Sequence, residues 1–338
     1  MEFSTTLLAW FRENGRQLPW RETRDPYAIW LSEIILQQTQ VKQGWDYWER
    51  FMHRWPTVEL LAAATEDEVL REWQGLGYYS RARNLHFAAR QIVEMGGFPQ
   101  TLEGIKSLKG VGDYTAAAIG SIAFDIPAAV VDGNVYRVLA RHYGIQTPVN
   151  TTEGKKEFAA LAQSLLPLKE VAAYNQAIMD FGAILCTPQA PRCIQCPLAE
   201  SCDALRTGRV SMLPVKRRNL KVRTRHLIYI YIRCQGYTAI HRRGEGDIWQ
   251  GLWEPLLEER EETIEERGER REEREKMGLK LVAKGVKHVL THQVLLADFY
   301  LWEPAERPAL PDDYIWIREE EIDNYGIPRL VDILLDKL

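Results

Sequence analysis

The sequence lacks the long apolar stretches that cross a membrane, because no run approaches the roughly 20 apolar residues that a spanning helix needs. The segment 1–20 also lacks the basic and then apolar pattern of a secretory signal. We therefore expect a cytoplasmic protein that does not associate with a membrane.

Cysteine is scarce, with five in 338 residues, and four of the five fall within one short segment. These four are Cys186, Cys193, Cys196 and Cys202, and Cys234 stands apart. Without a secretory signal, disulfides are not expected, so a metal site is the leading interpretation. Zinc sites usually show two separated cysteine pairs, whereas four thiolates crowded into one loop suit a 4Fe-4S cluster equally well. The spacing alone leaves both possibilities open.

The sequence also lacks an overall basic charge, with a formal net charge of −4, but two opposed segments produce that value. Residues 258–276 contain ten Glu against five Arg and one Lys, and are most simply a solvated helix. Residues 204–226 contain eight Lys or Arg and no acid. A phosphate backbone would be attracted to that local excess, although a solvated linker explains it as well.

The chain is organised around residues 107–139. Gly110-Val111-Gly112 leads into a small-residue helix that is predicted from about Tyr114 to Ala123. Such a turn presents backbone N–H groups at a helix N-terminus, where they can bind a phosphate. An apolar run then ends in Asp132, one turn before another periodic helix. Taken alone, Asp132 is more simply a helix N-cap than a catalyst.

Together, Leu108-Lys-Gly-Val-Gly112 and Val131-Asp-Gly-Asn134 closely resemble the helix-hairpin-helix and following aspartate of the DNA glycosylase superfamily typified by endonuclease III. The resemblance implies that Gly110, Val111 and Gly112 grip DNA phosphates, and that Asp132 acts at the sugar. The four-cysteine segment is similar to the cluster loop of that superfamily, which implies a 4Fe-4S cluster.

A second motif surrounds Glu33. The period of residues 27–41 predicts one helix, on which Ile29, Trp30 and Leu36 lie one turn from Glu33. Desolvation by these apolar neighbours would raise the pKa of Glu33, as a general acid near neutral pH requires. An ordinary helix glutamate in an ion pair is the alternative.

The segment Leu31-Ser-Glu-Ile-Ile-Leu-Gln-Gln-Thr-Gln-Val41 resembles the catalytic helix of the MutY-type adenine DNA glycosylases. The resemblance implies that Glu33 protonates the departing adenine and that Asp132 stabilises or captures the resulting sugar cation, with Tyr114 and Asn134 orienting these groups. It further implies a pocket for the flipped base, formed by Trp20, Arg21, Leu36 and Val41.

Residues 73–84 are similar to the minor-groove loop of the same family. The resemblance implies that Tyr78 is the wedge that stacks into the duplex, with Gln38 near it. An enzyme that acts on a glycosidic bond must extrude the nucleotide from the stack, and a wedge fills the gap. Without the resemblance, Tyr78 and Tyr79 would be taken as core aromatics.

We therefore expect an all-α helix-hairpin-helix glycosylase catalytic region with an iron–sulfur cluster loop, joined by a linker to an α+β Nudix-like C-terminal domain. The catalytic region covers residues 1–205, with the hairpin at about 105–125 and the cluster loop at 186–202. A basic linker covers residues 206–224. The C-terminal domain covers residues 225–338, with strands at 226–233, 279–283 and 293–302 and a helix at 331–338.

The C-terminal segment resembles the domain with which MutY-type enzymes sense 8-oxoguanine. Residues 247–254 fit its early loop, and residues 287–292 occupy the place of its Phe-Ser-His recognition loop. Leu290 and Thr291 replace the aromatic residue and the serine, so only His292 is unchanged. Residues 271–279 partly echo a Nudix box, but its upstream Gly and Glu are absent, so no Nudix hydrolysis is expected.

The resemblance predicts a monofunctional glycosylase that removes adenine from double-stranded DNA containing A:8-oxoguanine or A:G mispairs and acts as a monomer. Endonuclease III-type members carry a lysine where this chain has Tyr114, so no Schiff base is expected there. Two alternatives are a bifunctional glycosylase and lyase for pyrimidine lesions, and a protein that recognises mispairs without cleaving them.

Overall fold

The computed structural model describes residues 2–217, 222–259 and 274–338. The chain divides into two compact units, Met1–Ala62 with Phe87–Arg218 and Ala63–His86 with Asn219–Leu338. Most of the acidic run and the start of the Nudix-box echo lie outside the described residues. Among the helices that are described, none is long and apolar enough to cross a membrane.

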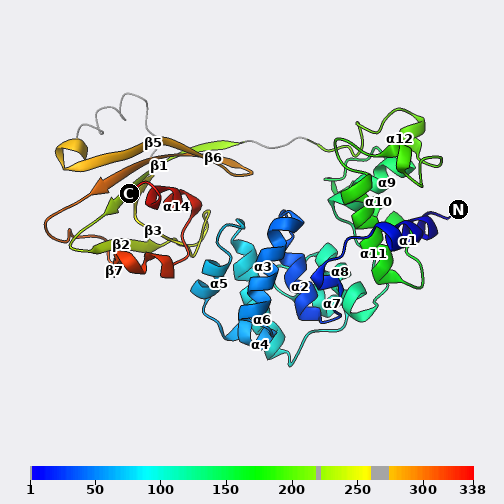
Figure 1. The fold of residues 1–338 in the computed structure, drawn as a ribbon, viewed down its shortest axis with the longest axis horizontal. Coiled ribbons are helices and arrows are strands. Elements are labelled where there is room, and N and C mark those ends of the chain that lie inside the picture. Colours follow the sequence, from blue (N-terminus) through cyan, green and yellow to red (C-terminus); the bar gives the residue numbers. More distant parts are fainter. Residues whose placement is uncertain (1, 218–221, 260–273) are drawn as a thin grey trace. The chain divides into compact units, whose positions relative to one another are not determined.

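The first unit is helical (Figure 1). Helix α6, Ser80–Glu94, begins in the second unit and continues into the first. The remaining helices and helical turns of the first unit are α1 (Phe3–Asn14), η1 (Pro19–Arg21), α2 (Pro26–Ile35), α3 (Val41–Arg54), α4 (Val58–Ala63), α7 (Leu102–Ser107), α8 (Asp113–Phe124), α9 (Gly133–Tyr143), α10 (Thr152–Leu165), α11 (Val171–Asp180), η2 (Phe181–Leu185), η3 (Cys193–Gln195) and α12 (Asp203–Arg206).

Helices α1 and α11 pack side by side although they are far apart in the sequence (Figure 1). Their apolar faces share one core with α9, in which Leu7, Leu139, Phe158 and Ala177 have no solvent exposure. Burial of these stripes is the main force that joins the N-terminal helix to the segment that carries the cysteines.

The helix predicted over residues 27–41 is shorter than expected, because α2 ends at Ile35 and α3 begins only at Val41. The residues between them form a turn in which Gln38 has a φ of +57°. The sequence of this turn at residues 37–40, Gln-Gln-Thr-Gln, offers no apolar face to bury, so the helical pattern of apolar residues stops at Leu36.

The second unit contains α5 (Glu66–Glu72) and two sheets. The four-stranded sheet has the order β4-β1-β6-β5, formed by Leu256–Glu259, Arg223–Ile232, Gln293–Trp302 and Leu279–Val289. Strands β1 and β6 are parallel, and both other pairs are antiparallel. A three-stranded sheet joins β3 (Trp253–Glu254), β2 (Tyr237–Arg242) and β7 (Tyr314–Arg318).

Strand β1 is buried on both faces, which explains its unbroken apolar sequence. Leu227 and Tyr229 belong to a core that also contains residues of α14, Arg329–Leu335, whereas Ile228 and Ile230 belong to a separate core. The alternation follows the two-residue period of a strand. A short 3₁₀ segment, η4, covers Glu319–Asn324.

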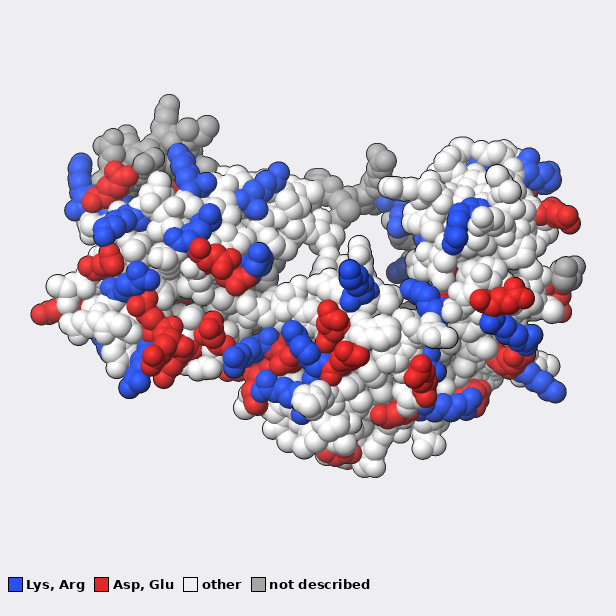
Figure 2. Space-filling view, viewed as in Figure 1, with Lys and Arg blue, Asp and Glu red and all other residues white. Residues whose placement is uncertain are grey.

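Charges of both signs are interspersed on the face of the molecule drawn in Figure 2. This mixture agrees with the small net charge. Any attraction to a polyanion therefore depends on local groups rather than on the total charge.

Candidate functional site

A cavity of about 750 Å³ in the first unit brings together the residues that the sequence assigns to catalysis and to the base pocket. Its size lies in the range of small-molecule sites. We call it the catalytic cavity. Its wall includes Trp20, Arg21, Glu33, Leu36, Gln38, Val41, Tyr114, Asp132 and Asn134.

Glu33 is buried on α2, at the wall of the catalytic cavity. Burial raises its pKa from 4.5 to about 7, and the nearby charge of Asp132 acts in the same direction. A hydrogen bond from Tyr114 and the charge of Arg21 oppose that rise. A substantial fraction of Glu33 therefore carries a proton at neutral pH, as a general acid must.

Tyr114, in the first turn of α8, donates a hydrogen bond to Oε2 of Glu33 at 2.7 Å. Its hydroxyl also lies 3.3 Å from the sulfur of Met179. Burial, with the charge of Glu33, raises the pKa of Tyr114 well above its ordinary value, so the hydroxyl keeps its proton. Tyr114 therefore orients the Glu33 carboxyl group and favours its ionised form.

Asp132 caps a helix and also lines the catalytic cavity. Its Oδ1 accepts hydrogen bonds from the backbone N–H groups of Asn134 and Val135, each at 2.8 Å, and so caps α9. Its Oδ2 accepts from Nδ2 of Asn134 at 2.7 Å and the residue lines the catalytic cavity. Burial raises the pKa of Asp132, against the effect of these three donors. The cap thus holds a carboxylate at the cavity wall.

Arg137, which is not among the residues predicted from the sequence, holds the amide oxygen of the Asn134 side chain. Its Nη2 donates to Oδ1 of Asn134 at 2.8 Å and to the carbonyl oxygen of Gly182 at 2.7 Å. Arg137 lies one turn after Asn134 on α9, so its helical spacing could have suggested the contact.

Asp180 and Arg16 are further residues that sequence reasoning missed. The Asp180 side chain has no solvent exposure and accepts from Nη1 and Nη2 of Arg21 at 2.8 and 2.9 Å, and from Nε of Arg16 at 2.9 Å. Although burial alone would raise the pKa of Asp180, hydrogen bonds from Arg21 and Arg16 bring it below its ordinary value. An aspartate within an apolar helix was the available signal, but its partners lie more than 150 residues away.

The hairpin turn between α7 and α8 has the conformation that its glycines predict. Gly110 has a φ of +80°, which favours glycine, and the backbone N–H of Val111 donates to the carbonyl of Leu108 at 3.1 Å. A Cβ atom added at Gly112 would meet nothing within 4 Å. Space for the close approach of another molecule is therefore available at the N-terminus of α8.

The four grouped cysteines line one small cavity of about 30 Å³, together with Arg141. Nη1 of Arg141 lies 3.4 Å from Sγ of Cys186, and its Nε donates to the carbonyl of Leu213 at 3.1 Å. Within the described ranges, no three His, Cys, Asp or Glu side chains are placed so that they could hold a metal ion. The donor set fits a thiolate-bound group, but the sulfur atoms are not arranged as ligands.

The predicted wedge, Tyr78, lies in the second unit and is half exposed. Its φ of +46° is unusual for a bulky residue. The buried Arg81 stabilises this turn, because its guanidinium lies over the ring of Trp73 and its Nη2 donates to the carbonyls of Leu76 and Gly77 at 3.2 and 3.3 Å.

A second cavity of about 810 Å³ lies within the second unit and contains the predicted recognition residues Leu290, Thr291 and His292. We call it the recognition cavity. It is also lined by Tyr78, whose hydroxyl contacts the hydroxyl of Thr291. Thr291 and His292 are exposed, whereas Leu290 packs partly against the sheet core.

The helical hairpin, Glu33 and Asp132 all lie within the part of the chain that a base excision repair family matches. The model of the HhH-GPD superfamily of base excision DNA repair proteins matches residues 31–167, and that of the NUDIX domain matches residues 228–337. The helical and sheet-containing parts of the predicted fold are thereby confirmed.

The adenine DNA glycosylase of Buchnera aphidicola subsp. Schizaphis graminum is 35% identical over 253 residues, which cover 74% of this chain and 73% of that protein. The chain therefore belongs to the adenine DNA glycosylase family. The mouse adenine DNA glycosylase is 45% identical over 226 residues, or 63% of this chain and 44% of that protein. This chain thus spans less than half the length of its mouse relative.

Solved structures agree with the helical fold. A thermostable thymine-DNA glycosylase is 32% identical, with a TM-score of 0.57 over 61% of this chain and 95% of that chain. A trapped endonuclease III–DNA covalent intermediate has a TM-score of 0.53 at 22% identity over 61% of this chain and 94% of that chain. At that identity, the second likeness shows the fold alone.

Proposed function

We propose that the protein is a monofunctional DNA glycosylase that removes adenine paired with 8-oxoguanine or guanine in double-stranded DNA, and that it acts as a monomer. The observation that carries this proposal is Glu33, a buried carboxyl group with a pKa of about 7 in the same cavity as Asp132. The relatives named adenine DNA glycosylase support adenine as the base that is removed.

In the proposed reaction, Glu33 transfers its proton to a ring nitrogen of the flipped adenine. The N-glycosidic bond then breaks, its electron pair leaves with the base, and the sugar acquires oxocarbenium character. Water completes the hydrolysis by adding at C1′ and releasing a proton. Trp20, Leu36 and Val41 provide the apolar surface against which the base packs.

Asp132 is the group that stabilises or captures the positively charged sugar. Its three hydrogen-bond donors, two of which belong to the backbone, hold it in one orientation at the cavity wall. Retaining glycosidases use a carboxylate in either of these two ways. Both ways require the ionised form, which the same three donors favour.

Tyr114 supports a monofunctional reaction, because a phenol cannot form a Schiff base with the sugar. Within the described part of the chain, no lysine lines the catalytic cavity. The product is then an intact abasic site, which breaks only on treatment with alkali.

DNA binding is proposed for two places. The turn Gly110-Val111-Gly112 would bind phosphates through backbone N–H groups, where the helix dipole of α8 favours an anion. Tyr78 would enter the base stack, supported by its exposed ring and fixed turn, with Gln38 close to the flipped nucleotide.

We propose that Thr291 and His292 recognise the 8-oxoguanine through hydrogen bonds. Both side chains are exposed at the wall of the recognition cavity. Leu290 offers apolar contact there but no aromatic ring.

The four grouped cysteines are proposed to hold a 4Fe-4S cluster, supported by their common cavity and by the Arg141 guanidinium beside Cys186. Such a cluster would stabilise the loop that connects them. We expect about four iron atoms and four acid-labile sulfides per chain. Cys196→Ser should lower both contents, whereas Cys234→Ser, which changes a buried cysteine outside the group, should leave them unchanged. One zinc ion per wild-type chain would contradict the proposal.

The decisive experiment is a single-turnover assay on duplexes with adenine opposite 8-oxoguanine, guanine, thymine or cytosine, each analysed with and without alkali. We expect alkali-dependent cleavage at adenine, fastest opposite 8-oxoguanine. Glu33→Gln should lose activity by about 10²-fold or more while it still binds the duplex. Cleavage without alkali would indicate a lyase, and binding without any release of adenine would indicate a recognition protein.

A further inference from the structure

Trp249 lies at the wall of the recognition cavity, at a distance of 40 residues or more in sequence from Leu290, Thr291 and His292. A purine base is flat and apolar on its faces, so a site that binds one usually offers an aromatic side chain. Leu290 cannot provide that surface. Tyr78 and Tyr79 also line the cavity, but Tyr78 is assigned to the wedge, and the indole of Trp249 is the larger aromatic group, which comes from a separate loop.

The backbone of Trp249 is held in an unusual conformation. Its φ of +60° lies in the left-handed region, which a bulky residue rarely adopts. Three hydrogen bonds close the turn around it, from Leu252 N to Trp249 O at 3.0 Å, from Gly251 N to Arg243 O at 2.9 Å and from Arg243 N to Leu252 O at 2.9 Å. Strain of this kind persists only where the surroundings enforce it, and it concentrates at functional sites.

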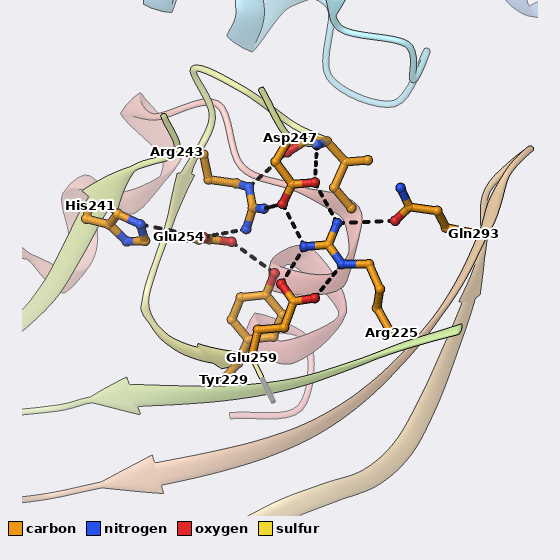
Figure 3. Close-up of polar contacts among 9 residues, drawn as sticks. Arg225, Tyr229, His241, Arg243, Asp247, Glu254, Glu259 and Gln293 are labelled. Atoms are coloured by element: carbon orange, nitrogen blue, oxygen red, sulfur yellow. Dashed lines mark hydrogen bonds and ion pairs between the residues drawn. The ribbon is translucent and has the colours of Figure 1, made fainter. Parts of the chain in front are cut away.

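A network of ion pairs around the buried Arg225 and Arg243 holds the residues at the start of this turn (Figure 3). Arg243 donates from Nε to the carbonyl of Ile248 at 2.9 Å, and it pairs with Asp247 at 2.6 Å and with Glu254 at 2.7 Å. Arg225, whose side chain is only 7% exposed, binds Asp247 from the other side at 2.6 Å.

Desolvation of Arg225 and Arg243 offsets much of their attraction to the carboxylates, so the network adds little net stability. Its contacts nevertheless tie Asp247 to two arginines and the carbonyl of Ile248 to Arg243. The geometry that this network fixes is that of the turn from Asp247 to Gly251. Trp249 is therefore presented in a defined orientation rather than left to move on a loose surface loop.

The indole has protein neighbours and also lines the recognition cavity. The His288 ring lies 5.9 Å from it, centroid to centroid, at an angle of 46°, and the Arg243 guanidinium lies 5.9 Å from the ring centroid. Part of the indole packs against the sheet core that includes Leu330, and part lines the recognition cavity.

We infer that the indole of Trp249 is the stacking surface for the purine opposite the adenine. This inference rests on the proposed role of the recognition cavity in binding that purine. Stacking engages the face that guanine and 8-oxoguanine share, so Trp249 supplies affinity for either purine, while the hydrogen-bonding groups of Thr291 and His292 supply the preference between them.

The test measures dissociation constants in the Glu33→Gln background, with an adenine duplex that carries 8-oxoguanine, guanine or a tetrahydrofuran abasic analogue in the opposite strand. Trp249→Leu should weaken binding to both purine duplexes by about tenfold and leave binding to the abasic duplex unchanged. Trp249→Phe, which keeps an aromatic ring, should recover most of the loss. Trp316→Leu is the matched control, because Trp316 packs in the other sheet core.

Each outcome has one meaning. Equal weakening on all three duplexes would overturn the inference, because a purely structural tryptophan does not depend on the opposite base. Unchanged affinities in a folded Trp249→Leu variant would overturn it as well. If the Glu33→Gln protein without further change binds the 8-oxoguanine duplex no better than the abasic duplex, the proposed role of the recognition cavity itself fails. Should Trp249→Leu not fold, Trp249→Phe must lose the part of the tryptophan fluorescence quenching that the 8-oxoguanine duplex causes and the abasic duplex does not.

Discussion

The protonation of Glu33 should set the alkaline limit of activity. Its pKa of about 7 lies above the ordinary value of 4.5, mainly because the folded protein removes the carboxyl group from water. The shift corresponds to about 3 kcal/mol of free energy that favours the protonated over the ionised form. At pH 7 roughly half of the molecules then hold the proton, against roughly 0.3% for a solvated glutamate. Burial thus increases the amount of active acid on the order of 10²-fold.

The sign of the pH dependence follows from the role of the proton. In the proposed reaction Glu33 acts in its protonated form, so activity is expected below the raised pKa and is lost as the pH rises through about 7. Tyr114→Phe removes a hydrogen bond that favours the carboxylate, so it should move this limit to higher pH by about one unit. Tyr136→Phe is a matched control, because Tyr136 packs on Phe158 in the helical core.

The assay is the single-turnover rate constant for release of adenine opposite 8-oxoguanine, measured from pH 5 to pH 9. We expect a tenfold fall per pH unit above the limit, and a further fall at the acid end as Asp132, whose pKa is raised by burial, takes up a proton. A rate that already declines from pH 5 would show that Glu33 is solvated in the folded protein. A limit that moves downward in Tyr114→Phe would refute the assigned direction of the hydrogen bond.

Three further predictions concern stability and DNA binding. Asp180→Asn should lower the free energy of unfolding by about 3 kcal/mol, because it leaves two arginines without their buried counter-charge, and a urea titration measures this. Between pH 4.5 and about 7, the folded protein holds a proton on Glu33 that the unfolded chain has released, so the stability of the wild type falls as the pH rises through this window. Glu33→Gln should remove this part of the pH dependence. Thermal melts of both proteins at pH 5 and pH 8 test the difference. Gly110→Ala should cost about 1 kcal/mol through its positive φ, whereas Gly112→Ala should melt like the wild type and weaken only duplex binding, measured by fluorescence anisotropy. Equal melting temperatures for the two glycine variants would contradict the assigned backbone conformation.

Local chemistry allowed much of the site to be predicted. Three of the four helical neighbours of Glu33 are apolar, so the spacing indicated its burial, although an ordinary glutamate in an ion pair stayed open as an alternative. Gly110 requires a left-handed turn, and Asp132 precedes a helix that it caps in the structure. The prediction of strands at residues 226–233 succeeded because β-branched and aromatic residues fill a strand that is buried on both sides.

Other features were not accessible from the sequence. The helix carrying Glu33 ends earlier than its apolar period suggested, because a polar turn follows it. The later apolar residues of that period, Leu36 and Val41, are not on the same helix but line the catalytic cavity. A periodic pattern reports which residues are buried, but it does not report whether one continuous element buries them.

The sequence by itself indicated most of the helices and strands, the order of the candidate motifs and the carboxyl group that would be desolvated, because each depends largely on neighbours within one or two turns. Only the tertiary structure decided which distant groups meet. Asp180 joins Arg16 and Arg21 across more than 150 residues, and Trp249 reaches the cavity of Thr291 from a separate loop. Such pairings depend on how whole faces pack, and a local pattern of residue types contains no information on the partner of a given charge or ring.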